Sequence, residues 1–379
     1  MSEIASQRPS RIVVDLDAIG HNLQAIRAQV GVPVMGIVKA NAYGHGLVPV
    51  ARHLQAQGVD QLGVAFVEEG VALRRAGITA PILVMGGIFG PQVALFLEHD
   101  LEITVSSLDK LRQVEATAQA MGRKATIHLK IDTGMERIGV HSYSAGPFVE
   151  AAAASPWCRL KGIYSHLACA DDPASPMTLL QLERFQEACA HFERIGAPMP
   201  LRHLANSGGV LHFPQTWLDI VRPGILLYGV LPDPASRMTI PVRPALSLVS
   251  RVVFFKVVKT GNPVSYGATW QPSVDTRIVT VPVGYGDGYP RALSSRGQVL
   301  LRGHRHPLVG RVCMDQFMVD LGPEGEAYNE DEVVLIGQQG DAGITTEALA
   351  QLAGTIPYEI LTGLNERIPR EYTGGTGSR

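Results

Sequence analysis

A single lysine interrupts the apolar and glycine-rich stretch V-K-A-N-A-Y-G-H-G at residues 38–46. Lys39 directly follows the apolar run Val34–Val38, which predicts a buried strand, and Tyr43 comes four residues later in a turn rich in Gly and Asn. Burying an ammonium group is costly unless it is paired or neutralised. Lys39 is therefore either a surface lysine whose stem covers apolar atoms at the strand end, or an amine held in a site for its chemistry.

Other polar residues also stand where predicted strands end. They are Lys130, Asp132 and Arg137 in H-L-K-I-D-T-G-M-E-R-I-G, His166 in Y-S-H-L, Asn206 and Ser207 in H-L-A-N-S-G-G, and Arg222 in V-R-P-G-I. Each of them alone can be a solvated charge or a helix N-cap, Ser207 in particular. Their common position at strand ends favours a shared catalytic rim.

Two of these segments are suited to bind a phosphate group. Ser207 is expected to begin a helix, where free backbone N–H groups and the helix dipole favour anions. Gly224, in Pro223-Gly224-Ile225, lets backbone amides approach a ligand closely. A lysine opposite a phosphate-binding segment indicates an aldehyde-bearing phosphorylated cofactor held as a Schiff base, and pyridoxal 5′-phosphate is that molecule.

The elements that must position these residues follow a repeating pattern. Between residues 33 and 225, short apolar runs alternate with segments whose apolar residues recur every three or four positions, such as Val67–Ala76, Leu108–Met121 and Met177–Ile195. The apolar runs predict strands at Pro33–Lys39, Gln61–Ala65, Pro81–Val84, Leu101–Val105, Ala125–Ile131, Arg159–Ser165, Leu201–Leu204 and Asp219–Arg222. This succession of β-then-α units predicts a closed parallel (β/α)8 barrel, whose chemistry lies where strands run into helices.

The regions on either side of the barrel differ from it in pattern. Arg11–Asp15 predicts an earlier strand, and the helix expected from about Ala18 would cap one end of the barrel. After the Pro-rich boundary Leu231–Arg237, β-rich runs follow with little helix between them: Val249–Val258, Arg277–Val283, Gln298–Arg302, Cys313–Leu321 and Asp331–Ile336. We therefore expect an N-terminal strand (residues 1–16) that associates with the β-domain, a cofactor-binding barrel (17–236) and a C-terminal mostly-β domain (237–379).

The composition restricts the class of protein. Of the 379 residues, 46% are hydrophobic and 18% are charged, with a net charge of −2, which is typical of a soluble globular protein. The chain has no block of Lys or Arg that would indicate nucleic-acid binding, no secretory leader and no apolar run of membrane-spanning length. Its four cysteines form no C-x-x-C pair and no cluster with histidine. We therefore expect reduced thiols, no bound metal and a cytoplasmic location.

The chain resembles the alanine racemases along nearly its whole length. The resemblance rests on the motifs V-K-A-N-A-Y-G-H-G, H-L-K-I-D-T-G-M-E-R-I-G, R-P-G-I-L-L-Y-G, V-S-Y-G-A-T-W, G-Y-G-D-G-Y-P-R and G-R-V-C-M-D-Q. It implies a pyridoxal-phosphate enzyme that interconverts L-alanine and D-alanine, either to supply D-alanine for peptidoglycan or to degrade it. It also implies a homodimer whose active sites are shared across the interface.

The resemblance implies two bases. Lys39 would carry the cofactor and act on one face of the external aldimine, and Tyr266 from the second subunit would act on the opposite face. Two opposed groups suit racemisation because a proton leaves one face and arrives at the other. Tyrosine is a weak base at its reference pKa of about 10. The role therefore requires a cationic neighbourhood, for which His166 with Arg222 is the candidate.

The remaining roles are also implied by the family. Arg222 would face the ring nitrogen of the cofactor and leave it unprotonated, because an arginine cannot accept a proton. Arg137 would bind the substrate carboxylate or the cofactor phenolic oxygen, and Lys130, when carbamylated, would orient Arg137. Met314 and Asp315 of the second subunit would face the substrate. The other cofactor contacts implied are Tyr43, His166, Asn206, Ser207, Gly224, Ile225 and Tyr358.

Alternative functions share parts of this pattern. A racemase of broader amino-acid specificity would have the same site behind a wider entrance. A pyridoxal-phosphate decarboxylase of basic amino acids shares the lysine strand and a Cys close before an Asp, which Cys313-Met314-Asp315 resembles, but it would place a carboxylate where Arg222 stands. A small non-catalytic cofactor-binding barrel would lack residues 240–370. An aldolase-type Schiff-base barrel would leave Tyr266 unexplained.

Overall fold

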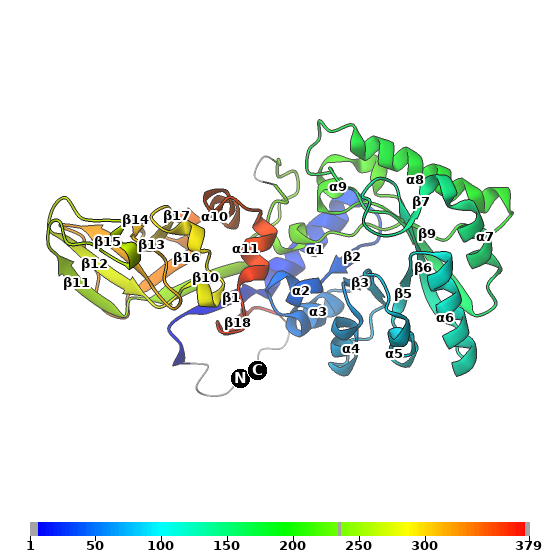
Figure 1. Cartoon of the computed structure of the whole chain (residues 1–379), viewed down its shortest axis with the longest axis horizontal. Coiled ribbons are helices and arrows are strands. Elements are labelled where there is room, and N and C mark those ends of the chain that lie inside the picture. The colour runs from blue at the N-terminus through cyan, green and yellow to red at the C-terminus, as the bar shows by residue number, and fades with distance from the viewer. Residues whose placement is uncertain (1–6, 234–235, 376–379) are drawn as a thin grey trace.

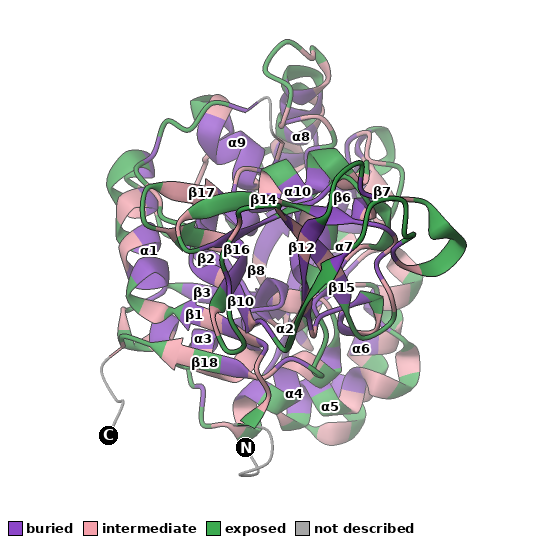
Figure 2. Cartoon of the chain, turned by 90° about the vertical axis from the view of Figure 1, so that its left-hand side faces the viewer, coloured by how far each residue is buried: buried purple, intermediate pink, exposed green. Residues whose placement is uncertain are grey.

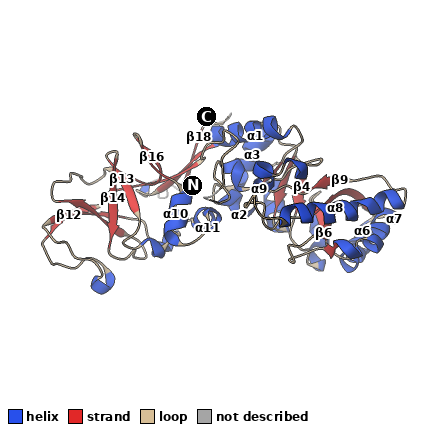
Figure 3. Ribbon diagram, turned by 90° about the horizontal axis from the view of Figure 1, so that it is seen from above, coloured by secondary structure: helices blue, strands red, loops and turns tan. Residues whose placement is uncertain are grey.

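The computed structural model describes residues 7–233 and 236–375. Figure 1 shows two parts, a barrel of strands surrounded by helices and a β-rich domain, with α11 (Pro357–Gly363) lying between them. Seen from above, helices surround the barrel strands, and the β-rich domain extends to one side (Figure 3). The expected (β/α)8 barrel followed by a mostly-β domain is therefore confirmed.

Parallel strands form the inner wall of the barrel. In spatial order they are β2 (Met35–Ile37), β3 (Gln61–Val64), β4 (Ile82–Val84), β5 (Glu102–Val105), β6 (Ala125–Asp132), β8 (Cys158–Tyr164) and β9 (Leu201–His203), with the short β7 (Val140–His141) paired to β6. Every residue of β2, β3, β4 and β5 is buried, as expected for parallel strands covered by helices, whereas β8 and β9 have exposed and partly exposed residues toward their starts.

The eighth strand of the barrel is reduced to a single bridge. Val221 pairs in parallel with Val34, and Met35 N–H donates to the Val221 carbonyl over 2.8 Å. On the other side, Arg222 N–H donates to the Ala205 carbonyl over 2.9 Å. The segment thus closes the ring between β9 and β2 where Asp219–Arg222 was predicted, but it is short because Pro223, which has no N–H, follows directly.

Helices cover the outside of this wall. They are α1 (Leu16–Val30), α3 (Leu47–Ala56), α4 (Val67–Arg75), α5 (Val93–Glu98), α6 (Leu108–Met121), α7 (Gly146–Ala154), α8 (Met177–Arg194) and α9 (Ser207–His212), with 3₁₀ turns η2 (Gly90–Gln92), η3 (Ser142–Ser144), η4 (Pro214–Thr216) and η5 (Ile225–Tyr228). The short element α2 (Lys39–Tyr43) is instead a left-handed turn at the mouth of the barrel. Asp15 caps α1 by accepting the N–H of Ala18 over 3.0 Å. The expectation that this helix caps one end of the barrel is wrong, because α1 packs beside α3 and η5 in the helical layer.

The β-rich domain contains both the first and the last described strand of the chain. Its sheet has the order β11-β12-β15-β14-β13-β16-β10-β1-β18, with β17 paired to β16. The strands are β1 (Arg11–Asp15), β10 (Leu246–Arg251), β11 (Phe254–Val258), β12 (Thr276–Val281), β13 (Gln298–Leu301), β14 (His304–Val309), β15 (Phe317–Gly322), β16 (Glu332–Gln339), β17 (Ala342–Ile344) and β18 (Arg370–Thr373). β1 lies antiparallel to β10 and parallel to β18.

Shorter elements complete this domain. They are the helices α10 (Thr346–Ala353) and α11 and the 3₁₀ turns η6 (Tyr266–Ala268), η7 (Tyr285–Asp287) and η8 (Arg291–Leu293). The predicted strand Val249–Val258 is divided into β10 and β11. The N–H of Val252 donates to the Asp331 carbonyl, just before β16, whereas the N–H of Val253 donates to the Thr280 carbonyl in β12. Figure 2 shows buried strands behind exposed loops at the outer end of the domain.

Candidate active site

A cavity of about 280 Å³ opens where the barrel strands run into helices. It is lined by Ile37, Lys39, Ala40, Tyr43, Met85, His166, Asn206, Ser207, Arg222, Gly224, Tyr358 and Thr362. Eight of the residues predicted from the sequence thus meet in one cavity. The other four, Ile37, Ala40, Met85 and Thr362, were not predicted, although Met85 directly follows β4 and so obeys the strand-end rule. Thr362 and Tyr358 come from α11, which packs against α2.

Lys39 begins a left-handed turn. The strand β2 ends at Ile37, two residues before the lysine, so Lys39 does not itself end the strand. Ala40, Asn41 and Ala42 have φ of 54° with ψ between 43° and 53°, and Tyr43 has φ of 51°. Each such non-glycine residue costs about 1–2 kcal/mol relative to the right-handed conformation. Strain of this kind persists only where the surroundings hold it in place, and it is concentrated at functional sites.

Three side chains hold the turn. Glu69, from α4, accepts the N–H of Ala40 over 2.7 Å. Asn41 Oδ1 accepts the N–H of Leu47 over 2.8 Å. His45 Nδ1 donates to the Tyr43 carbonyl over 2.9 Å, and burial lowers the pKa of this imidazole to about 4, so it is neutral. Neither Glu69 nor His45 was predicted, because their roles depend on the shape of the turn.

Hydroxyl groups line one side of the cavity. Tyr43 is buried, and a Cβ at position 224 would clash with its hydroxyl, so glycine is required there. Ser207 Oγ accepts the N–H of Gly224 over 3.0 Å and that of Leu226 over 3.3 Å. Its own hydroxyl proton remains available to a ligand. Burial raises the pKa of the Tyr43 and Tyr358 phenols, so both stay protonated donors.

The expectation that Ser207 begins a helix is confirmed. Asn206, not Ser207, caps α9, because Asn206 Oδ1 accepts the N–H of Gly209 over 3.0 Å. Ser207 is the first helical residue and acts through its hydroxyl. Ile225 is fully buried in η5 behind Gly224, so only its backbone can serve a ligand.

The amine of Lys39 lies among cations. Burial, followed by the positive charge of Arg137, lowers the pKa of this amine, and Glu69 opposes the shift. A larger share of the lysine is therefore neutral and nucleophilic than in water, which favours reaction with an aldehyde.

Arg222 is buried at the same mouth without an adjacent carboxylate. Its Nη2 donates to the Ser165 carbonyl over 2.7 Å and to the Leu204 carbonyl over 3.1 Å. His166 Nδ1 lies 3.4 Å from the same nitrogen. Burial, followed by the charge of Arg222, holds the pKa of His166 well below its ordinary value. The prediction that His166 contributes positive charge to this neighbourhood is therefore wrong, because its imidazole is neutral.

Lys130 and Asp132 at the end of β6 and Arg137 in the following turn lie in different environments. Asp132 accepts the backbone N–H groups of the following turn, including Gly134 over 2.8 Å, and these bonds outweigh burial in lowering its pKa. Lys130 is buried 4.8 Å from the Tyr164 ring centre, and burial followed by the Arg222 charge holds its pKa well below the ordinary value. Arg137 is exposed. None of the three lines the cavity.

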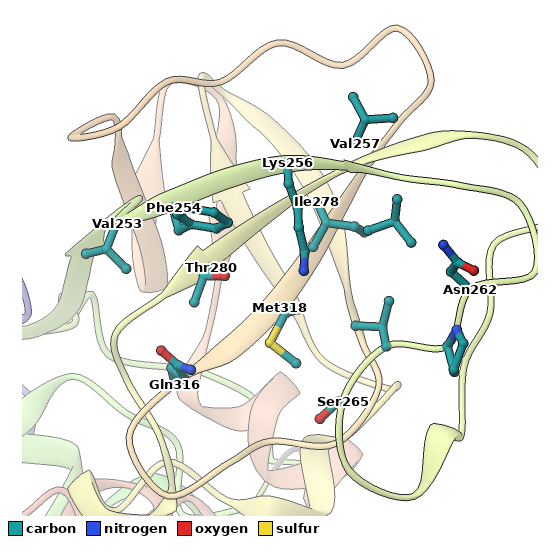
Figure 4. A pocket seen from close by; sticks show the side chains of 13 residues that line it. Val253, Phe254, Lys256, Val257, Asn262, Ser265, Ile278, Thr280, Gln316 and Met318 are labelled. Atoms are coloured by element: carbon teal, nitrogen blue, oxygen red, sulfur yellow. The ribbon is translucent and has the colours of Figure 1, made fainter.

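The remaining predicted residues meet elsewhere. Tyr266, Met314 and Asp315 line a separate hollow of about 530 Å³ on the β-rich domain, and 71% of Tyr266 is exposed. The neighbouring hollow, shown in Figure 4, extends this face over β11, β12 and β15 and presents the exposed Phe254 and Val257. Within one chain, Tyr266 therefore does not reach the Lys39 cavity.

The mouth of the barrel combines the amine of Lys39, whose pKa is lowered, with the hydroxyl groups and the guanidinium that line the same cavity. Family models of alanine racemase match the N-terminal domain at residues 14–232 and the C-terminal domain at residues 245–372. An alanine racemase of Symbiobacterium thermophilum is 43% identical over 99% of this chain and 100% of its own length. The chain therefore belongs to the alanine racemase family.

Solved structures agree with this assignment. The alanine racemase from the D-cycloserine-producing Streptomyces lavendulae has a TM-score of 0.94 and 40% identity, covering 97% of this chain and 98% of that one. A histidine racemase from Leuconostoc mesenteroides has a TM-score of 0.86 and 28% identity, covering 97% and 99%. No helix among the described residues is long and apolar enough to span a membrane. Nor does the described part of the chain contain a cluster of His, Cys, Asp or Glu that could hold a metal ion.

Glu69 tests whether the left-handed turn needs its clamp. Glu69→Ala should lower the free energy of unfolding by about 2 kcal/mol, because a carboxylate that accepts the N–H groups of Ala40, Ala65 and Phe66 is lost. It should also slow the borohydride trapping of pyridoxal phosphate on Lys39. Glu68→Ala, at the exposed neighbouring position, is the matched control and should change neither quantity. Equal trapping rates for both variants would contradict the claim that Glu69 holds the turn.

Proposed function

We propose that this enzyme interconverts L-alanine and D-alanine with pyridoxal 5′-phosphate bound at Lys39 and with Tyr266 of a second subunit as the opposing base. The observation that carries the proposal is the cavity at the barrel mouth, where a lysine whose pKa is lowered by burial faces phenol, hydroxyl and guanidinium donors. We further propose that the protein acts in the cytoplasm, where it supplies D-alanine for peptidoglycan or degrades it.

The residues of the cavity fit the cofactor. The Lys39 amine can bind its aldehyde, and the hydroxyl groups of Tyr43, Ser207 and Tyr358 can donate to its phosphate beside the backbone at Gly224 and Ile225. The bound cofactor would withdraw electrons from the substrate and acidify its Cα–H bond. The Nε–H of Arg222, which has no acceptor among the residues the structure describes, is the donor suited to the ring nitrogen, with His166 and Asn206 nearby.

Lys39 and Tyr266 divide the proton transfers in this proposal. Lys39 removes or delivers the Cα proton on its own face of the substrate, and the Tyr266 phenol does so on the other. Because His166 is neutral, Arg222 is the remaining cation of the predicted pair that can stabilise a phenolate.

The position of Tyr266 supports the proposal of a second subunit. The tyrosine, Met314 and Asp315 share an exposed hollow away from the Lys39 cavity, beside the apolar surface that includes Phe254 and Val257. Apolar surface of this kind is characteristic of a protein interface. In a symmetric dimer, this face of each chain would complete the cavity of the other. Met314 and Asp315 would then face the substrate, with Arg137 near its carboxylate.

The breadth of substrates deserves a separate test. A solved structure with a similar fold is described as a histidine racemase, so the same scaffold also occurs in a protein named for a different amino acid. Alanine remains the proposed substrate because, in the proposed dimer, Tyr266 and Met314 of the second subunit would narrow the space beside the Lys39 cavity to that of a small side chain. Racemisation assays with a panel of L-amino acids distinguish this from a broad racemase, and the absence of released CO₂ distinguishes it from a decarboxylase.

Complementation between two inactive variants tests the shared site. Lys39→Ala and Tyr266→Phe should each abolish most racemisation, and Lys39→Ala should also lose the visible colour of the bound cofactor. Mixed under conditions of subunit exchange, the two proteins should recover about a quarter of the wild-type activity, because half of the dimers are mixed and each mixed dimer has one intact site. Near-normal turnover of either variant in both directions, or no recovery on mixing, would refute the arrangement.

Arg222→Glu tests the role at the ring nitrogen. A carboxylate keeps that nitrogen protonated, whereas arginine does not. The variant should racemise alanine more slowly and should produce more pyruvate per turnover by transamination. Arg222→Lys, which keeps the charge but loses the planar donor, is the control and should slow the reaction without raising transamination. An unchanged ratio of racemisation to transamination in Arg222→Glu would contradict this role of Arg222.

We also propose that Lys130 is carbamylated. Its buried amine has a strongly lowered pKa and makes only a long contact of 3.5 Å with the Ile131 carbonyl. Addition of CO₂ with loss of a proton would give it a negative group able to orient Arg137. Mass spectrometry of the native protein should show one added CO₂, which Lys130→Ala should lack. An unmodified wild-type mass in bicarbonate buffer would contradict this.

A further inference from the structure

A chain of hydrogen bonds crosses the interior of the barrel from Arg222 to its opposite end. Arg222 Nη1 lies 3.0 Å from His203 Nδ1. His203 Nε2 lies 2.9 Å from His128 Nδ1. His128 Nε2 lies 2.8 Å from Glu102 Oε2. Both imidazoles have no exposed surface, and Glu102 is 6% exposed.

The donors and acceptors in this chain of hydrogen bonds allow donation in one direction only, from Arg222 toward Glu102. A guanidinium can only donate, so His203 Nδ1 accepts and the proton of His203 is on Nε2. That proton is donated to His128 Nδ1, so the proton of His128 is also on Nε2 and is donated to Glu102. A second proton on either ring would face another N–H group. Both imidazoles are therefore neutral, in agreement with burial as the main cause of their lowered pKa values.

Glu102 is ionised by the same reasoning. Its two oxygens face three donors, namely His128, the Gln61 amide at 2.5 Å and the Lys161 ammonium. An adjacent ammonium and hydrogen-bond donors at both oxygens favour the ionised form of the carboxyl group over the protonated one. Burial alone would raise the pKa of Glu102, but the bonds from His128 and Lys161 bring it below the ordinary value. The Glu102 carboxylate, which is also paired with Lys161, thus stands at one end of the chain of hydrogen bonds and the Arg222 cation at the other.

The backbone of the barrel is adapted to this chain. The pairing of β6 with β8 shifts register between Ile127 and His128, a bulge that redirects the following side chain. Opposite it, a Cβ at Gly162 would clash with the His128 ring. Apolar side chains would fill the same volume at lower desolvation cost, since buried charges are often no more stable than apolar replacements. These features indicate a role beyond packing.

We propose that Glu102 is the remote counter-ion of Arg222, and that it fixes the charge and orientation of this arginine through His128 and His203. The inference rests on the proposed function in one respect, that Arg222 faces the ring nitrogen of the cofactor. Glu102, His128 and His203 are positioning residues, because none of them lines the cavity. The hydrogen bond to His203 holds Nη1, and the bonds to two backbone carbonyls hold Nη2, so the Nε–H of Arg222 keeps one direction.

The first test uses the wild-type apoprotein and needs no variant. Nitrogen-15 NMR of the imidazoles should show His128 and His203 neutral and protonated on Nε2 around neutral pH, with the Nε–H signal of Arg222 ordered. A doubly protonated ring, or a proton on Nδ1 of either residue, would overturn the proposal.

The second test compares carboxylates near the same end of the barrel. Glu102→Gln should lower kcat for alanine by about tenfold, the loss typical of removing an outer hydrogen-bond partner, with little change in KM. It should also broaden the Arg222 Nε–H signal of the apoprotein. Asp219→Asn is the matched control, since Asp219 is paired with Arg202 outside the chain of hydrogen bonds, and it should leave kcat unchanged.

The double variant Glu102→Gln/Lys161→Met separates electrostatics from stability. Removing both charges should restore the melting temperature lost in Glu102→Gln, because the ammonium no longer faces an amide, but it should not restore kcat. Recovery of kcat together with stability would reduce Glu102 to a structural role and overturn the inference. An inactive wild-type protein with the expected imidazole protonation would instead refute the proposed function and leave the counter-ion in place.

Discussion

The left-handed turn at residues 40–43 is the constraint on which the site depends. It sets the direction in which Lys39 leaves the end of β2, and it places Tyr43 against position 224, where only glycine leaves room for the phenol. Such a conformation is unfavourable for four successive non-glycine residues. Its persistence requires partners from other elements, and Glu69 and His45 provide them. The completed barrel therefore holds the strained turn in place.

Burial in this compact site also determines the charges of the basic groups around the cavity. Lys39, Lys130, Arg137 and Arg222 are basic groups close to one another, and burial shifts three of them toward their neutral forms. His166 and His203 are neutral for the same reason. The mouth of the barrel thus combines a nucleophilic amine with a retained guanidinium charge, which an anionic ligand would complement.

Much of the architecture could be predicted from the sequence, because each barrel strand is a short apolar run followed by a helical pattern. Residues at strand ends, such as His166 and Arg222, could be assigned to the site on that basis alone. The turn geometry could not, since nothing in A-N-A-Y distinguishes left-handed from right-handed residues. Glu102 and His128 were also missed. They lie inside strands, where an isolated polar residue gives no sign of the partner it meets across the barrel.

The pairing of β1 with both β10 and β18 has a consequence for the order of folding. The strand at residues 11–15 is synthesised first, yet its partners lie at residues 246–249 and 370–373. Such distant contacts close large loops and form late. As the nascent chain emerges, the barrel can assemble while this apolar segment is still unpaired, and the segment is then an exposed edge open to misassociation until its partner strands have been made. Truncation near the C-terminus would leave that edge permanently uncovered.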